Sequence, residues 1–378
     1  MSDEKLRQLS NRAERAFGTS SPSQIVGNRK AIIGPLRLDL LTRDADDARQ
    51  LLLMNQTPSP RQLASLEQAI RLQRPAPACK IGALTELPEP GNWLETQWKK
   101  FQPTLMRVQA GIARIERVDD PERKRGGRTG IGTGFLVAPN MLLTAGHVAD
   151  ELSFSVESLE PGQAVVDFDA YLHSSEVKTY DILQVVNLDS RLDLALLRIA
   201  EAPENSTRPI LMPQPSSSSV GTPICVVGYP EDDPRNPPVF ISIVFGSELG
   251  SGKTEFGIKR AAIGEIVRAE DYLIFHDSST LGGNSGSPVL DILTGQVIGV
   301  HVSGRAMMRN AAVAGAQTLE FVSRSLAMGF SRSNARDVPP SAEPQPPVEK
   351  PSLSQVAEAK FALTVRVTLG DVSMVTQP

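Results

Sequence analysis

Three residues of this 378-residue chain have the types and surroundings that nucleophilic catalysis requires. Ser285 lies in the glycine-rich stretch 281–288, LGGNSGSP, which is typical of a loop that presents a hydroxyl group to a substrate. A serine hydroxyl is a weak nucleophile at neutral pH and needs an adjacent base. His147 follows an apolar run and is the candidate base, and Asp193 precedes another such run and is the candidate carboxylate that orients the imidazole.

The same serine loop has the composition of an oxyanion hole. The backbone N–H groups of Gly283 and Ser285 are predicted to converge on the oxygen of an attacked carbonyl, because glycine leaves them unencumbered. A glycine-serine loop is weak evidence on its own, since such loops are common. His147, Asp193 and Ser285 are far apart in the sequence, so only folding can bring their side chains together.

The order histidine, aspartate, serine is that of chymotrypsin-like proteases and differs from that of subtilisins and α/β-hydrolases. The motifs TAGH (144–147), DLALL (193–197) and GGNSGSP (282–288) resemble those of the trypsin/chymotrypsin-like serine protease family, and most of all those of its bacterial glutamyl-endopeptidase (V8-like) branch. The resemblance covers roughly residues 106–330. It implies a mostly β fold, a chymotrypsin-like double six-stranded antiparallel β-barrel, with the active site in the cleft between the barrels.

The resemblance also indicates the substrate-binding residues. Ser279 stands at the pocket-base position of trypsin-like enzymes, and the absence of an aspartate there disfavours cleavage after Arg or Lys. Thr280 and His301 match the threonine and histidine with which V8-like enzymes bind an acidic side chain, which implies cleavage after Glu or Asp. The alternative, in which His301 only lines the barrel wall, stays open. Ser303 and Gly304 complete the predicted substrate-binding set.

Two departures from the family concern activation. Asn284 occupies the position where trypsin-like zymogens have the aspartate that pairs with a newly formed N-terminal amine, so that switch is not available. V8-like enzymes place their own N-terminal amine in the acidic pocket, whereas this protease region begins about 105 residues into the chain. A cut in the basic loop 121–130, at 123–128, would supply such an amine, so processing is one hypothesis and a solvated, uncut turn is the other.

Two kinds of element must position these residues. Helices are expected near residues 3–17, 44–54, 60–74 and 93–108, the third with Ser59 as its N-cap and a capping box at Gln62. Short strands are expected at 134–138, 141–144, 164–168, 182–186, 194–199, 224–227, 239–244, 264–269, 273–276, 288–290 and 297–302. The predicted parts are a helical accessory or regulatory domain (1–105), a protease domain (106–332), a proline-rich linker (333–352) and a tail with a strand-like segment (353–378).

Composition restricts the function classes. A net charge of −4 argues against a nucleic-acid binder, and neither a secretory signal nor a membrane span is evident. The two cysteines, Cys79 and Cys225, lie in different segments and leave none for a disulfide beside His147, which favours a reducing compartment and a cytoplasmic location. We find no metal-ligand cluster, phosphate loop or cofactor fingerprint and expect no cofactor.

Three hypotheses for the whole chain remain. The first is a serine endopeptidase acting on protein or peptide substrates, with a regulatory protein partner at the N-terminal helical domain. The second is a catalytically silent trypsin-like binding module, which the retention of every motif residue disfavours. The third is an HtrA-type quality-control protease, disfavoured by Ser287 where that group has glycine and by the lack of an evident PDZ-like domain after residue 330.

Overall fold

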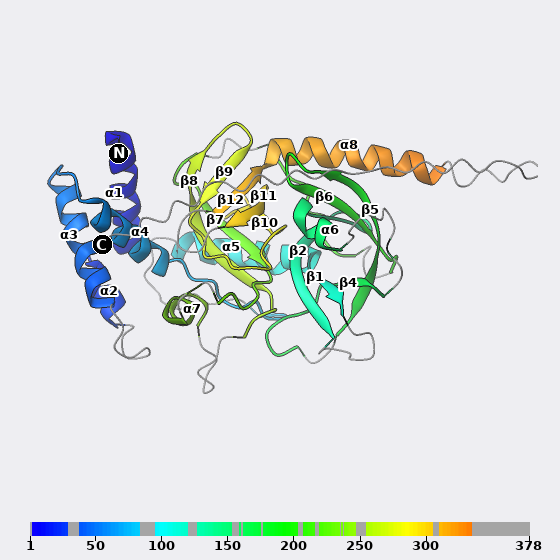
Figure 1. Ribbon diagram of the computed structural model, residues 1–378, viewed down its shortest axis with the longest axis horizontal. Helices are drawn as coiled ribbons and strands as arrows, with labels where there is room; N and C mark the ends of the chain where they lie inside the picture. The colour runs from blue at the N-terminus through cyan, green and yellow to red at the C-terminus, as the bar shows by residue number, and fades with distance from the viewer. Residues whose placement is uncertain are drawn as a thin grey trace, which may run out of the picture. The chain divides into compact units, whose positions relative to one another are not determined.

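Two closed six-stranded antiparallel β-barrels form the centre of the molecule (Figure 1). The computed structural model describes residues 2–28, 38–83, 95–119, 127–152, 159, 162–174, 177–202, 207–215, 219–234, 236, 238–246, 255–304 and 310–334. Met1–Ser333 forms one compact unit, to which the barrels and the N-terminal helices both belong. The two barrels confirm the predicted fold class, a mostly β chymotrypsin-like double barrel with helices in the N-terminal region.

The first barrel is built from β1 to β6, hydrogen-bonded in the order β1-β2-β3-β6-β5-β4 and closed by pairing of β4 with β1. Its central strands β3 and β6 are almost wholly buried, because residues such as Leu142 and Leu196 fill the interior. The strands are β1 (Ile112–Val118), β2 (Arg128–Ala138), β3 (Met141–Ala145), β4 (Ala164–Asp167), β5 (Thr179–Asp189) and β6 (Leu194–Ile199).

The second barrel repeats this arrangement with β7 to β12, in the order β10-β11-β12-β9-β8-β7. Pairing of β7 with β10 closes it, and Val226 and Val289 face each other across that pair. The strands are β7 (Pro223–Gly228), β8 (Arg260–Ala269), β9 (Leu273–His276), β10 (Pro288–Asp291), β11 (Val297–Gly304) and β12 (Asn310–Ala314).

Four helices precede the barrels and have a hydrophobic core of their own. The helices are α1 (Asp3–Phe17), α2 (Pro22–Asn28), α3 (Leu38–Leu53) and α4 (Pro60–Leu72). Leu9 and Phe17 of α1 pack in this core with Ala48 of α3 and Leu66 of α4. The capping box predicted at the start of α4 is present.

The chain between α4 and the first barrel packs on the barrels. Backbone hydrogen bonds join residues 75–79 to β8 and to the residue before it: Ile263 N–H donates to the Pro75 carbonyl at 3.0 Å, and Cys79 N–H donates to the Lys259 carbonyl at 2.8 Å. Helix α5 (Glu95–Val108) then buries Trp98 and Phe101 in the core that it shares with the barrels. The aromatic stripe of this helix is therefore core packing against the barrels.

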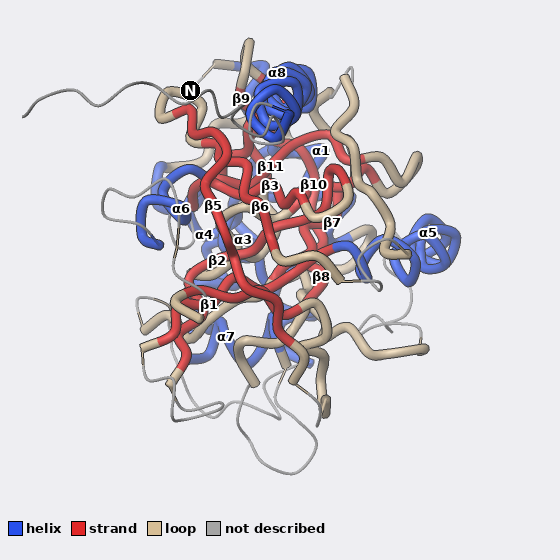
Figure 2. Tube along the Cα trace, turned by 90° about the vertical axis from the view of Figure 1, so that its right-hand side faces the viewer, coloured by secondary structure: helices blue, strands red, loops and turns tan. Residues whose placement is uncertain are grey.

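Helix α8 (Gly315–Asn334) follows β12 directly and reaches from the second barrel to the first (Figures 1 and 2). Phe321 is buried in the shared core, and Ser325 accepts a hydrogen bond from Asn187 of β5 at 2.8 Å. This helix was not predicted from the sequence, nor were strands β1 and β12.

One predicted strand is wrong. Residues 239–244 belong to helix α7 (Pro238–Phe245). Phe240 and Val244 are one helical turn apart and pack in the same core as Ile224 and Ala262 of the second barrel. A short apolar run that is buried all round has no periodicity that separates a helix from a strand, and Pro238 at the first turn favours the helix.

The structure also bears on the cysteines and on the predicted absence of a membrane span. Cys79 and Cys225 are free thiols and both are buried. Among the described residues, no helix combines the length and the apolar character needed to cross a bilayer. The predicted linker begins at residue 333, but helix α8 continues to Asn334. The rest of that linker, the strand-like tail segment and most of the basic loop at 121–130 lie outside the described residues.

Candidate active site

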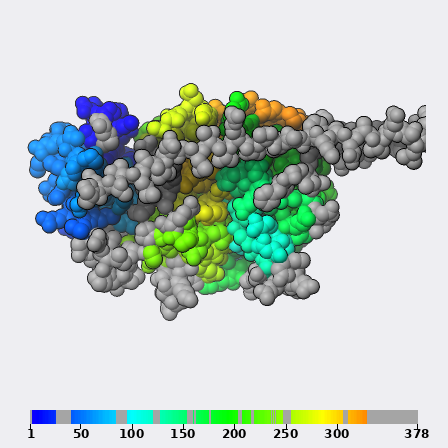
Figure 3. Space-filling view, in the orientation of Figure 1, coloured from blue at the N-terminus to red at the C-terminus, as the bar shows by residue number. Residues whose placement is uncertain are grey.

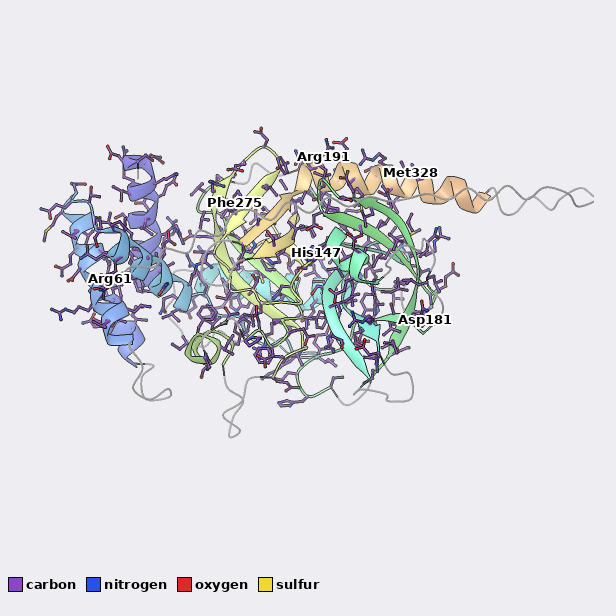
Figure 4. All side chains as sticks on the ribbon, in the orientation of Figure 1. Arg61, His147, Asp181, Arg191, Phe275 and Met328 are labelled. Carbon is purple, nitrogen blue, oxygen red and sulfur yellow. The ribbon has the colours of Figure 1, made fainter. Side chains whose placement is uncertain are left out.

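Neighbouring strands of the first barrel bring His147 and Asp193 together. Strand β3 ends at Ala145, helix α6 (Gly146–Leu152) begins next to it, and Ala145 pairs with Leu194 at the start of β6. The His147 Nδ1 atom lies 2.9 Å from Asp193 Oδ2, and the His147 backbone N–H donates to Asp193 Oδ1 at 2.8 Å. Asp193 therefore binds both the ring and the backbone of the histidine. Figure 4 shows that His147 lies where the two barrels meet.

The backbone around Asp193 is shaped for this contact. Asp193 has φ = 55°, a left-handed conformation that is uncommon for a residue other than glycine. Its carbonyl accepts the Gly146 N–H at 2.9 Å, and a Cβ atom on Gly146 would lie 3.0 Å from Asp193 Oδ1. A side chain at position 146 would therefore crowd the carboxylate, which favours glycine before the histidine.

This contact changes the acid-base properties of His147. The hydrogen bond with Asp193 raises the pKa of the imidazole above its ordinary value of 6.5, more than partial burial lowers it. With Nδ1–H directed at the carboxylate, Nε2 is left with a lone pair that can accept a proton. The pair is thus arranged as a base with a fixed tautomer.

The loop that carries Ser285 is fixed against strand β2 of the first barrel. Thr133 N–H of β2 donates to the Ser285 carbonyl at 2.8 Å, and Gly286 N–H donates to the His301 carbonyl at 2.7 Å. Gly286 has φ = 87°, and a Cβ atom there would lie 2.0 Å from the Thr133 carbonyl oxygen. Only glycine permits the loop to approach this closely.

Ser285 is half-buried. Between Ser285 Oγ and the His147 ring, both within the described part of the chain, the structure has no hydrogen bond. Such a bond is often long before substrate arrives and shortens in the reacting complex. The structure therefore joins His147 to Asp193 directly and leaves Ser285 in the adjacent loop.

The Gly282–Gly283 peptide has a defined orientation. The Gly282 carbonyl accepts the Glu231 N–H at 2.8 Å, so the N–H of Gly283, on the other side of this planar peptide, points the opposite way. The Gly283 carbonyl in turn accepts the Thr133 hydroxyl at 2.7 Å. Within the described residues, neither the Gly283 N–H nor the Ser285 N–H has a protein acceptor, so both remain available to a substrate oxygen.

Thr133 and Glu231 were missed by the sequence analysis. Their sequence separation from Gly283 is long, and neither belongs to a recognisable motif. Glu231 also anchors its segment to the first barrel, since Arg114 Nη2 of β1 lies 2.6 Å from its carboxylate. The only sequence signal is the position of Glu231 just after the apolar strand β7.

The predicted pocket residues lie in two adjoining segments. Ser279 and Thr280 follow β9, and His301, Ser303 and Gly304 lie in β11. Ser279 and His301 are buried, whereas Ser303 and Gly304 are exposed. A Cβ atom on Gly304 would lie 3.5 Å from Thr280 Oγ1, which shows that the two segments are adjacent.

A second histidine, not predicted from the sequence, accompanies His301. The Nε2 atom of His276 lies 3.2 Å from Nδ1 of His301, and the two ring centroids are 5.2 Å apart. Burial, with a smaller contribution from His147, lowers the pKa of His301 to about 3, so its ring is neutral at pH 7. His276 is fully buried, and its pKa is lowered as well, by burial and by His301.

Metal binding has no support in the described part of the chain. No group of three or more His, Cys, Asp or Glu side chains there is placed to hold a metal ion.

Part of the chain matches a known protein family. Residues 132–300 match the trypsin-like peptidase domain. Glutamyl endopeptidase of Staphylococcus aureus (strain MW2) is 25% identical over 223 residues, which cover 58% of this chain and 58% of that protein. The enzyme of strain MRSA252 is 25% identical over 215 residues, covering 56% of this chain and 51% of that protein. The chain thus spans little more than half the length of these relatives.

Solved structures of two proteases align with the chain at low identity. The serine endoprotease from Yersinia pestis has a TM-score of 0.39 and 18% identity, over 67% of this chain and 69% of that one. The Rv3671c protease of M. tuberculosis in its inactive form has a TM-score of 0.38 and 18% identity, over 58% of this chain and 89% of that one.

The double barrel and the matched residues define the class. The chain contains a trypsin-like serine peptidase domain, and the relatives it resembles are glutamyl endopeptidases. The family predicted from the three motifs is therefore confirmed.

Proposed function

We propose that this protein is a serine endopeptidase in which Ser285, His147 and Asp193 form the catalytic triad. The observation that carries the proposal is the contact of 2.9 Å between His147 Nδ1 and Asp193 Oδ2, beside a serine loop with two unpaired backbone N–H groups. A base with a fixed tautomer next to a hydroxyl and an anion-binding pair of N–H groups is what acyl transfer requires. The substrate is a protein or a peptide.

The proposed reaction has two halves. His147 Nε2 takes the Ser285 hydroxyl proton as Oγ attacks the scissile carbonyl carbon, and the N–H groups of Gly283 and Ser285 stabilise the resulting oxyanion. His147 then gives its proton to the leaving amine, which departs and leaves an acyl group on Ser285. Water, deprotonated by His147, attacks this ester, and the acyl product is released as the serine is restored.

The test is hydrolysis of a peptide library by the full chain. We expect wild-type protein to cleave, and Ser285→Ala and His147→Gln to lose cleavage by several orders of magnitude. Ser219→Ala, which changes an exposed serine outside the site, serves as the matched control and should cleave as the wild type does. Cleavage that persists in Ser285→Ala would refute the triad, and a wild type without any turnover would favour the silent binding module.

The proposed preference is for Glu, and to a lesser degree Asp, on the amino side of the cleaved bond. Support comes from Thr280 and the His276–His301 pair, whose hydroxyl and imidazole N–H groups can donate to a carboxylate. A carboxylate that approaches His301 would also favour protonation of its ring. His301→Gln should lower kcat/KM for Glu substrates at least tenfold while changing it little for uncharged residues. An equal loss of kcat/KM for Glu substrates and for uncharged substrates would indicate that His301 only lines the barrel wall.

Three further proposals concern the whole chain. Free, buried Cys79 and Cys225 support a reducing, cytoplasmic location. The N-terminal helical region is proposed to regulate the peptidase and to bind a partner protein. Processing between residues 123 and 128 is tested by mass spectrometry of the active protein, since an intact and fully active chain excludes it.

A further inference from the structure

Two fully buried carboxylates of the second barrel lie at the strand end that leads into the predicted pocket. Glu265 belongs to β8, and Asp277 is the first residue after β9; both are 0% exposed. Glu265 N–H donates to Asp277 Oδ1 at 2.7 Å, and Asp277 N–H donates to the Glu265 carbonyl at 3.2 Å. Two carboxylates at such a site are tolerated only when cations face them, because burial of an unpaired charge is strongly unfavourable.

The facing cations come from the N-terminal helical region. Arg12 Nη2 of α1 donates to Asp277 Oδ2 at 3.0 Å, and Arg74 Nε donates to the same oxygen at 3.0 Å. Arg74 Nη2 also donates to Glu265 Oε1 at 2.5 Å, and Arg15 Nη2 lies 2.7 Å from Glu265 Oε2. The arginines thus precede residue 105, whereas both carboxylates belong to the peptidase barrel.

These contacts are shielded from solvent. The side chains of Arg12 and Arg74 are only 7% and 1% exposed. Figure 3 shows the helical region, in blue, beside the second barrel. Burial alone would raise the pKa of Asp277, but Arg74 and Arg12 outweigh it and hold that pKa below its ordinary value. Arg12 also donates to Glu67 of α4 at 2.9 Å, so its position is fixed from its own side of the junction.

Asp277 is joined to the pocket on both sides along the chain. The preceding residue is His276, whose ring contacts His301, and the following residues are Ser278, Ser279 and Thr280. The Ser278 carbonyl accepts a hydrogen bond from the Asn310 side chain. A Cβ atom on Gly264 would lie 2.5 Å from Ser278 N, so this segment has no room to shift toward β8.

We propose that Arg12, Arg15 and Arg74 are positioning residues for the substrate pocket. They act through the paired carboxylates Glu265 and Asp277 on His276 and on the segment Ser278–Thr280. The inference rests on the proposed endopeptidase function, because the pocket is the one that binds the residue before the cleaved bond. In this view the N-terminal helical region supplies the counter-charges that hold a pocket wall in place. It is a fixed part of the substrate site.

The functional test compares Arg12→Gln with Arg61→Gln in the full chain. Arg61 is the matched control, because it is an arginine of the same helical region that pairs with Asp44 on an exposed surface, far from the barrels (Figure 4). We expect Arg12→Gln to raise KM for a Glu-containing peptide at least tenfold, with kcat changed less than threefold. Arg61→Gln should leave both constants unchanged.

A second readout does not depend on activity. With ¹⁵N-labelled histidine in the full chain, the ring signals of His276 and His301 should shift in Arg12→Gln and stay in place in Arg61→Gln. The His147 signals should stay in place in both variants. If wild-type protein hydrolyses no peptide, the proposed function fails, while these ring signals still decide whether Arg12 positions the two histidines.

Arg15→Gln provides a second test that remains valid if the Arg12→Gln protein does not fold. Arg15 is 31% exposed, and among the described residues its ion pair is with Glu265, so its removal leaves Arg12 and Arg74 in place. We expect this variant to fold and to raise KM two- to fivefold. A folded Arg12→Gln or Arg15→Gln protein with wild-type KM, or with unchanged His276 and His301 signals, would overturn the inference.

Discussion

At the scale of single residues, the site depends on groups that are held by their backbone. Asp193 binds the ring and the N–H of His147, and its own carbonyl is bound by Gly146 N–H. Because three contacts fix this pair, the imidazole is oriented before any substrate binds. Such preorganisation is where an active site gains most of its rate.

The first prediction concerns pH. In the proposed triad the neutral imidazole of His147 is the base, so kcat/KM should fall as pH drops through the pKa of His147. The hydrogen bond with Asp193 raises that pKa, which places this limb above pH 6.5. Asp193→Asn removes the charge, so the limb should move to lower pH and kcat should fall by about 10⁴-fold. A pH–rate profile measures both, and an unshifted limb would exclude His147 as the titrating base.

The second prediction concerns the oxyanion loop. Thr133 is fully buried, and its hydroxyl donates to the Gly283 carbonyl while accepting the Tyr229 N–H at 3.1 Å. Thr133→Val should lower kcat roughly tenfold, less than removal of an oxyanion donor itself, and destabilise the fold by about 1–3 kcal/mol. Thr129→Val, at an exposed position of the same strand, is the control. Equal kcat in the two variants would contradict this role.

The residues of the site were unequally predictable. His147, Asp193 and Ser285 are each embedded in a motif of contiguous residues, so the sequence analysis singled them out. Thr133 and His276 act through contacts with residues 150 and 25 positions away and carry no local pattern. Partners of this kind are known only once the register of the strands is known.

At the scale of elements, the strand pattern predicted most of the strands, and the resemblance of the three motifs predicted their closure into two barrels, but the pattern did not distinguish all buried segments. Strands β6 and β9 have the predicted bounds, whereas the segment at 239–244 forms helix α7. The missed strand β12 is short and rich in alanine, which has little β propensity. Pairing with β11 and β9 decides its conformation.

The third prediction tests the packing of β8 against the pocket segment. A Cβ atom at Gly264 would lie 2.4 Å from Ser278 Oγ and 2.7 Å from Ser278 Cα. Gly264→Ala should therefore push this segment outward, with a destabilisation of about 1–3 kcal/mol and a higher KM. Urea unfolding and steady-state kinetics measure the two effects. If Gly264→Ala had wild-type stability and wild-type KM, the segment Ser278–Thr280 would be able to shift without cost, and the prediction would be wrong.

At the scale of the whole molecule, the peptidase and the N-terminal helices form one compact unit. Helix α5 buries Trp98 and Phe101 in the barrel core, residues 75–79 extend the sheet beside β8, and Arg12 and Arg74 face buried carboxylates. The sequence predicted the helical character of this region. It gave no sign of the buried charges, because their partners lie about 200 residues away or more.

The fourth prediction is that the barrels depend on this region. A fragment of residues 106–334 would leave Glu265 and Asp277 without Arg12 and Arg74, and removal of one partner from a buried ion pair costs about 3–5 kcal/mol. We expect the fragment to unfold at much lower urea concentration than the full chain, or not to fold. A fragment as stable as the full chain would contradict the account of the interface.

The central claim is that Ser285 is a nucleophile activated by His147. It is tested most directly by treating the full chain with a fluorophosphonate and mapping the covalent adduct by mass spectrometry. We predict a single adduct, on Ser285, that forms with wild-type protein and is lost in both Ser285→Ala and His147→Gln. An unmodified Ser285 in folded wild-type protein, or an adduct that forms equally fast without His147, would contradict the claim.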